Sequence, residues 1–205
     1  MLLPTRQLQR VLVVALAALS VWVAIQPVSR VDWFIENLFV WIAAVLLISL
    51  RNRVVLSTTA SLSIALFVAM QVYGSHFAYQ PALGASVSSL FGSERNSFDR
   101  VMHLASGLLL LVPMAELLEG AGGLSRKGAL FSAVVALTAL GAVYEIVEWG
   151  SMIVLAPQEA ALFVGLQGDP WDAQKDMGLA LLGSFAAFVL VRTRGTFTAS
   201  RAAGV

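Results

Sequence analysis

Acidic residues recur at helical spacing near the ends of several apolar segments. Glu145 and Glu148 are three residues apart, and Asp172 and Asp176 are four apart. Residues at these spacings share one face of an α-helix, so each pair would present two carboxylates in one direction. A set of carboxylates together with an imidazole is suited to bind Mg²⁺, Ca²⁺ or Mn²⁺, or a Zn²⁺ held by nitrogen and oxygen ligands. The predicted metal ligands are Glu145, Glu148, Asp172, Asp176, His103 and Asp169, and all of them except Asp169 are also the predicted catalytic groups.

Further polar residues stand next to these ligands in the sequence. Asp99 lies four residues before His103 and shares its helix face, and Arg100 and Lys175 offer positive charge to buried carboxylates. The longest connection, 74–97, carries His76 and Tyr79, which would close the site from above. The residues expected to contact a substrate or to support the ligands are Glu36, Asn37, His76, Tyr79, Asp99, Arg100 and Lys175.

Six apolar runs must position these residues. The chain is 59% hydrophobic and 12% charged, whereas soluble domains carry about 25% charged residues. About 20 apolar residues cross the hydrocarbon as a helix. The expected spans are 10–26, 32–50, 54–73, 98–118, 129–154 and 171–191. We therefore expect an all-α polytopic membrane protein, a bundle of six transmembrane helices forming a single domain over 1–205.

Lysine and arginine gather at one set of run ends. That set comprises Arg6, Arg10, Arg51, Arg53, Arg126, Lys127, Arg192, Arg194 and Arg201, against four basic residues at the other ends. The positive-inside rule then places both termini of this multi-pass protein in the cytoplasm. Only Glu116 and Glu119, of all the acidic residues, fall on the inner side. The predicted pocket therefore faces outward.

Composition also excludes several classes of function. A formal net charge of +1 argues against a nucleic-acid partner, which requires a basic surface. The chain has no cysteine, so disulfides and thiolate chemistry are excluded. No nucleophile elbow, Walker loop or HExxH pair occurs. The expected partners are the lipid bilayer and a lipid or cell-envelope precursor.

The depth of Glu145 and Glu148 in the membrane decides whether these two carboxylates require a functional explanation. If the fifth span continues to Val154, both lie below the outer surface, where an ionised carboxylate costs roughly 2.5–3.5 kcal/mol. A metal ion, a counter-ion or a proton must then offset that cost. If the span instead stops near Gly150, both glutamates are interfacial anchors. We favour the longer span, because ionisable groups inside a membrane usually serve a function.

Five sequence blocks carry a family resemblance. They are WFIEN at 33–37, HFAY at 76–79, RNSFDRVMH at 95–103, YEIVEW at 144–149 and GDPWDAQKDM at 168–177. In order and content they resemble the YjdF-like bacterial inner-membrane proteins, a family that implies no established activity. Phe77 and Gln71 depart from that pattern, where tyrosine and histidine are common. DRVMH, YEIVE and DMGLALLG are more distantly similar to VanZ-like membrane proteins, which implies a shared fold and an envelope role, although Ala180 replaces a frequent asparagine.

Three hypotheses remain open from the sequence. In the first, a divalent ion in the carboxylate and histidine pocket activates water or polarises a phosphate or ester, which would make the protein a metal-dependent membrane hydrolase or transferase. In the second, the acids bind a proton or coupling cation in a small transporter. In the third, the cluster is structural, pairing Arg100 and Lys175 with carboxylates, and the protein is not a catalyst. The one-sided charge distribution argues against the second hypothesis.

Overall fold

The structure is a computed structural model that describes residues 5–80, 82–90, 96–155, 157–158 and 169–194. These residues form helices and no strand. The helices are α1 (Thr5–Val23), α2 (Arg30–Leu50), α3 (Thr58–His76), α4 (Ala82–Leu90), α5 (Phe98–Gly120), α6 (Arg126–Val154) and α8 (Asp172–Arg194). Six of them, all except α4, are long and apolar enough to span a membrane. The all-α fold with six membrane helices is thus confirmed.

Serine residues set the starts of three spans. Ser29, Ser57 and Ser125 each precede a helix in an extended conformation, and each hydroxyl accepts the backbone N–H three residues later. Such caps satisfy N–H groups that have no partner inside the helix. The chain therefore begins each of these helices at a polar residue, a few positions away from where the apolar run begins.

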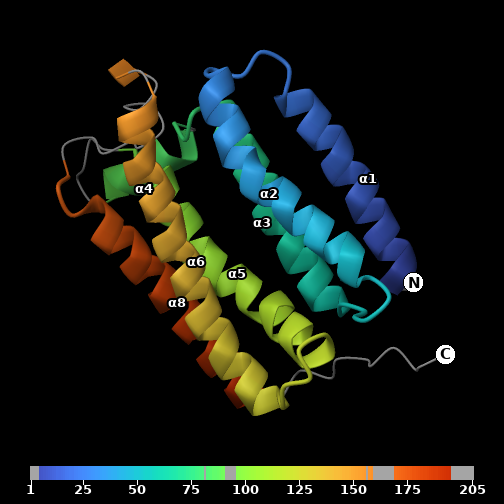
Figure 1. Ribbon diagram of the computed structural model, residues 1–205. Helices are drawn as coiled ribbons and strands as arrows, with labels where there is room; N and C mark the ends of the chain where they lie inside the picture. The colour runs from blue at the N-terminus through green and yellow to red at the C-terminus, as the bar shows by residue number, and fades with distance from the viewer. Residues whose placement is uncertain (1–4, 81, 91–95, 156, 159–168, 195–205) are drawn as a thin grey trace.

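Consecutive long helices run up and down, in two groups (Figure 1). α1 and α2 pack against α3, and α5, α6 and α8 pack against one another. The contact of α3 with α5 joins the two groups. An apolar core fills the middle of the second group, where Leu111, Ala133 and Leu137 are buried together. α5 is therefore the central helix, while α1 exposes nearly all of its surface.

Two glycines bring α5 and α8 into close contact. A Cβ atom on Gly107 would lie 2.1 Å from the carbonyl oxygen of Ala180, and one on Gly183 would lie 2.3 Å from that of Leu104. Small residues at helix interfaces allow membrane helices to approach closely, since dispersion and hydrogen bonding hold them together there. These contacts fix the spacing between the two helices that carry Asp99, Asp172 and Asp176.

The connections show one agreement with expectation and one difference. α6 continues past Gly150 to Val154, as the favoured longer helix requires, and the depth of Glu145 and Glu148 in the membrane stays a prediction. The expected 74–97 connection contains a helix, α4, which packs against α5. It also begins later than expected, because α3 extends to His76.

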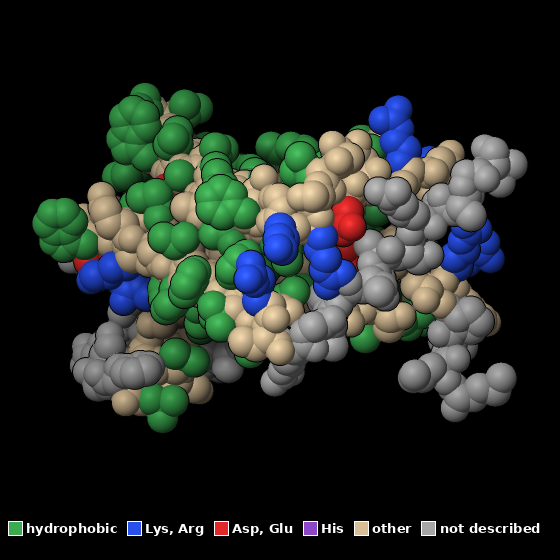
Figure 2. All heavy atoms as spheres, turned by 90° about the horizontal axis from the view of Figure 1, so that it is seen from below, with side chains coloured by type: hydrophobic (Ala, Val, Ile, Leu, Met, Phe, Trp, Pro, Cys, Tyr) green, Lys and Arg blue, Asp and Glu red, His purple; other side chains and the backbone are tan. Residues whose placement is uncertain are grey.

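The basic residues gather at one end of the bundle. α1 begins and α8 ends there, and the turn after α2 and the start of α6 carry Arg51, Arg53, Arg126 and Lys127 (Figure 1). Figure 2 looks onto this end and shows lysine and arginine side chains across it, with few acidic side chains in view. The cytoplasmic location of this end stays a prediction of the positive-inside rule.

Candidate functional site

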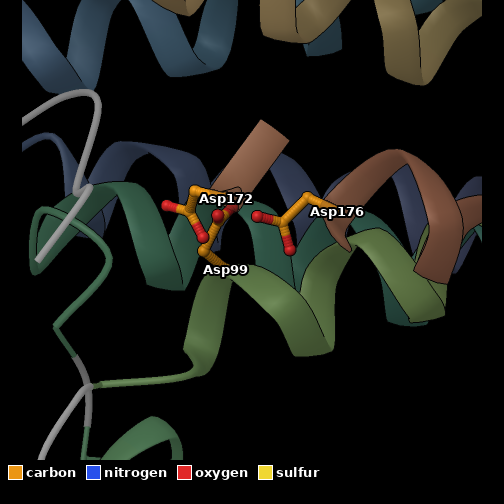
Figure 3. Close-up of side chains that lie close together, drawn as sticks. All are labelled: Asp99, Asp172 and Asp176. Carbon is orange, nitrogen blue, oxygen red and sulfur yellow. The ribbon is translucent and has the colours of Figure 1, made fainter. Parts of the chain in front are cut away.

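Three aspartates converge where α5 and α8 begin. Asp99 belongs to the first turn of α5, and Asp172 and Asp176 occupy successive turns of α8. One carboxylate oxygen of each lies within 4.8 Å of the others. Figure 3 shows the three side chains close together. Asp172 and Asp176 are buried, and their carboxyl groups lie close together. Two carboxyl groups at such close range repel unless they share a proton or a cation.

One oxygen of this cluster stands out. Asp176 is only 1% exposed, and its Oδ1 atom accepts no hydrogen bond from any residue that the structure describes. Its carboxylate points toward Asp99 and Asp172 (Figure 3). A buried polar atom without a partner is costly, and several kcal/mol is typical for a charged one. The arrangement therefore suits an additional ligand between the three side chains.

His103 connects this cluster to α6. Its Nε2 atom lies 3.2 Å from Oε1 of Glu145 and 3.5 Å from Oδ1 of Asp99. Glu148 lies one turn along α6 from Glu145, on the same face of the helix, and both glutamates are buried. The structure thus brings the five predicted catalytic groups near Asp99. Asp99 itself, expected only to support the ligands, lies between the two groups of acids.

Asp169 differs from the other predicted ligands. It precedes α8 and therefore lies outside the helix face that Asp172 and Asp176 share. Its Oδ2 atom accepts from Lys175 Nζ at 2.6 Å and pairs with the Arg100 guanidinium. The Lys175 ammonium holds the pKa of Asp169 below its usual range, helped by the N–H of Trp171 and by Arg100. Two cations therefore occupy this carboxylate already, which makes it the least suited of the six to bind a metal.

A hydrogen-bond network surrounds the buried Glu36 on α2. The Tyr144 hydroxyl donates to Glu36 Oε2 at 2.7 Å, and Gln71 Nε2 donates to the same oxygen at 3.0 Å. The Tyr79 hydroxyl donates to Gln71 Oε1 at 2.6 Å, and burial raises the pKa of Tyr79. The ring of Tyr144 also packs edge-on against His103, with centroids 5.7 Å apart. Tyr144 thus joins Glu36 to the carboxylate cluster.

A family model for predicted membrane proteins, DUF2238, matches residues 8–196. The chain belongs to this family. It is also 29% identical over 178 residues to the inner membrane protein YjdF of Escherichia coli K12, covering 86% of this chain and 85% of that protein. No solved structure matches. The YjdF-like resemblance is confirmed, whereas the VanZ-like similarity stays a prediction.

Membership of the DUF2238 family agrees with six helices that can span a membrane, and the chain is a multi-pass inner-membrane protein. Neither the family description nor the name of the relative assigns an activity. What the polar residues do must therefore be argued from their chemistry.

Two residues that were expected to contact a substrate or to support the ligands pack the helices together. Asn37 is buried, and its Nδ2 atom donates to the Trp33 carbonyl at 2.7 Å and to Ser75 Oγ at 2.8 Å. His76 Nδ1 lies 2.8 Å from the Val23 carbonyl oxygen, and its ring stacks on a tryptophan of α1. His76 therefore packs α3 against α1, and the expectation that it covers the carboxylates from above is wrong.

Sequence reasoning missed Tyr144 and Gln71. Both are neutral residues in apolar runs, and their partner Glu36 is 108 and 35 residues away in the chain, respectively. The one local signal was the position of Tyr144, directly before Glu145.

Proposed function

We propose that the protein binds a divalent cation between α5, α6 and α8 and uses it on a lipid or envelope precursor at the membrane surface. The observation that carries the proposal is the buried, unpartnered Oδ1 of Asp176, which faces the carboxylates of Asp99 and Asp172 (Figure 3). A membrane protein is destabilised by uncompensated buried charge, and a divalent ion would offset it at all three carboxylates together.

The donor set favours a hard ion. Three carboxylates from two helices suit Mg²⁺, Mn²⁺ or Ca²⁺, while the imidazole of His103 would also suit Zn²⁺. A bound ion of this kind lowers the pKa of a water ligand or polarises a phosphoryl or carbonyl oxygen. Glu145, which lies against His103, would accept the proton of such a water. The reaction class proposed is metal-dependent hydrolysis or group transfer.

A cation- or proton-coupled transporter is the second candidate. The observation that favours it is Glu116, at the opposite end of α5, which is 2% exposed and has a buried oxygen, Oε1, without a hydrogen-bond partner among the described residues. Its other oxygen accepts the N–H of Ser57 at 2.8 Å, at the start of α3. That contact satisfies a backbone N–H group at the start of α3, which explains the burial of Glu116 without transport.

A metal-retention measurement tests the proposal. Detergent-purified protein is equilibrated with Mn²⁺, dialysed and analysed by inductively coupled plasma mass spectrometry, together with Asp176→Asn and a control, Glu119→Gln, at the far end of α5. We expect near-stoichiometric Mn²⁺ in the wild type and in Glu119→Gln, and its loss from a folded Asp176→Asn variant. Wild-type protein that retains no divalent ion from Mn²⁺, Mg²⁺, Ca²⁺ or Zn²⁺ would refute the metal-dependent function and favour a structural cluster or a transporter.

A further inference from the structure

We propose that Arg100 and Lys175 form a binding site for the phosphate group of the substrate, and that the carboxylate of Asp169 occupies this site until a phosphate displaces it. The inference rests on the proposed function, because it places the phosphate beside the bound cation. It concerns binding only and names the substrate class as a phosphate monoester or diester.

The two cations already define a position for an anionic oxygen. Arg100 on α5 and Lys175 on α8 reach the same atom, Oδ2 of Asp169. Side chains from two helices thus converge on one negatively charged oxygen. A guanidinium and an ammonium around a single oxyanion are the groups that proteins use to hold phosphate.

This position adjoins the carboxylate cluster. The Arg100 guanidinium that pairs with Asp169 also lies 3.3 Å from Oδ1 of Asp172, which belongs to the proposed cation site. A phosphate bound by Arg100 would therefore stand next to the cation. Its several oxygens can contact the arginine, the lysine and the metal at once, whereas a carboxylate has only two.

Asp169 is suited to be displaced. It lies before α8 and outside any helix, and its partner Lys175 is half exposed. Ion pairs that water reaches contribute little net stability, so exchanging one anion for another at such a pair is cheap. The second oxygen of Asp169 accepts only the N–H of Trp171, two residues on, among the bonds that the structure gives it.

The charges around the site make phosphate binding depend on the cation. Asp99, Asp172 and Asp176 together would repel an anion, and Arg100 and Lys175 supply only two positive charges. A divalent ion reverses that balance. The inference therefore predicts that phosphate binds weakly to the metal-free protein and well to the Mn²⁺-loaded one.

Calorimetric titration of the Mn²⁺-loaded protein tests the inference, with inorganic phosphate as the free probe and with nanodiscs of phosphatidylcholine, with or without phosphatidate, for the lipid form. Arg100→Gln is expected to weaken phosphate binding about tenfold, the usual loss for a charged hydrogen-bond donor. Asp169→Asn should strengthen it about threefold or more, because a competing anion is removed. The matched control is Arg30→Gln, which removes an exposed cation at the same end of the bundle and should change nothing.

The outcomes separate the two proposals. If Mn²⁺ binds but neither phosphate nor phosphatidate does, the phosphate site is refuted and the cation site stands. If Mn²⁺ does not bind, the proposed function fails and the inference falls with it. Phosphate binding that Asp169→Asn weakens would also overturn the inference, because Asp169 would then be holding the site together. A response to inorganic phosphate alone supports a soluble phosphate, and a response to phosphatidate alone supports a lipid headgroup.

Discussion

A single methyl group at Gly107 should disturb both the bundle and the proposed cation site. In Gly107→Ala the new Cβ would lie 2.1 Å from the Ala180 carbonyl oxygen and 2.4 Å from the Ser184 nitrogen. Both are backbone atoms, which cannot rotate out of the way as a flexible side chain does. The two helices must therefore move apart by about 1 Å for this carbon to reach even a tight contact distance.

The size of the effect follows from two opposing terms. Replacing glycine by alanine inside a helix gains roughly 0.5–1 kcal/mol through lower backbone entropy in the unfolded chain. Forcing an extra methyl group into a packed interface costs about 1–3 kcal/mol. The difference between these ranges is a net loss of about 0–2.5 kcal/mol in the free energy of unfolding, with a central value of roughly 1 kcal/mol.

The cation site should respond more strongly than stability. Gly107 and Asp99 lie on one stripe of α5, two turns apart, and Asp176 and Ala180 lie on one stripe of α8. Metal sites require ligand distances within about 0.2 Å of ideal values, so a shift of about 1 Å between the helices misplaces them. We expect Mn²⁺ affinity to fall about tenfold or more.

Gly178→Ala on α8 is the matched control, since a Cβ atom there meets no other atom within 4 Å. It should leave stability unchanged or raise it by up to about 1 kcal/mol. Stability is measured by heating the protein in detergent and monitoring the loss of folded protein by size-exclusion chromatography. Mn²⁺ affinity is measured by electron paramagnetic resonance of the free ion. If Gly107→Ala matched Gly178→Ala in both assays, the close contact of α5 and α8 would not position the carboxylates, and the reasoning would be wrong.

Three further variants test the roles of other polar residues. Tyr144→Phe removes one of the donors to Glu36 and should lower the unfolding free energy by about 1 kcal/mol in the same thermal assay; an unchanged melting temperature would mean that the bond contributes nothing. Glu116→Ala removes the acceptor for the Ser57 N–H and should cost about 1 kcal/mol while Mn²⁺ retention stays intact; lost retention would instead couple the two ends of the bundle. His76→Ala should loosen α1 and increase proteolysis before α2 without changing Mn²⁺ affinity, and a weaker affinity would return this histidine to the site.

The spans could be predicted because run length alone decides them. A helix that crosses the hydrocarbon requires about 20 apolar residues, and the chain has six such runs. The ends of the helices were less predictable. Hydropathy indicates which residues lie in lipid, whereas capping residues decide where the helix itself begins. The third expected span began at Val54, but α3 begins at Thr58, after the hydroxyl of Ser57 caps it.

The site was predictable only within each helix. Spacing alone puts Asp172 with Asp176 and Glu145 with Glu148. It does not say that α5 lies against α8, which depends on the close contacts at Gly107 and Gly183. His76 was misplaced for the same reason, because the sequence does not show that it lies against α1.

The distribution of buried acids along α5 favours chemistry at one surface over transport. His103 and Glu116 are 13 residues apart on this helix, or about 20 Å at the usual rise per residue. Between these two levels the described core is apolar and closely packed, with Leu111, Ala133 and Leu137 from α5 and α6 buried against one another. A transported ion would have to pass through that core, where an unpaired charge is costly. A cation held among Asp99, Asp172 and Asp176 would meet a substrate at the membrane surface, and the apolar core would not have to open. The packing of the core therefore favours the enzyme hypothesis over the transporter hypothesis.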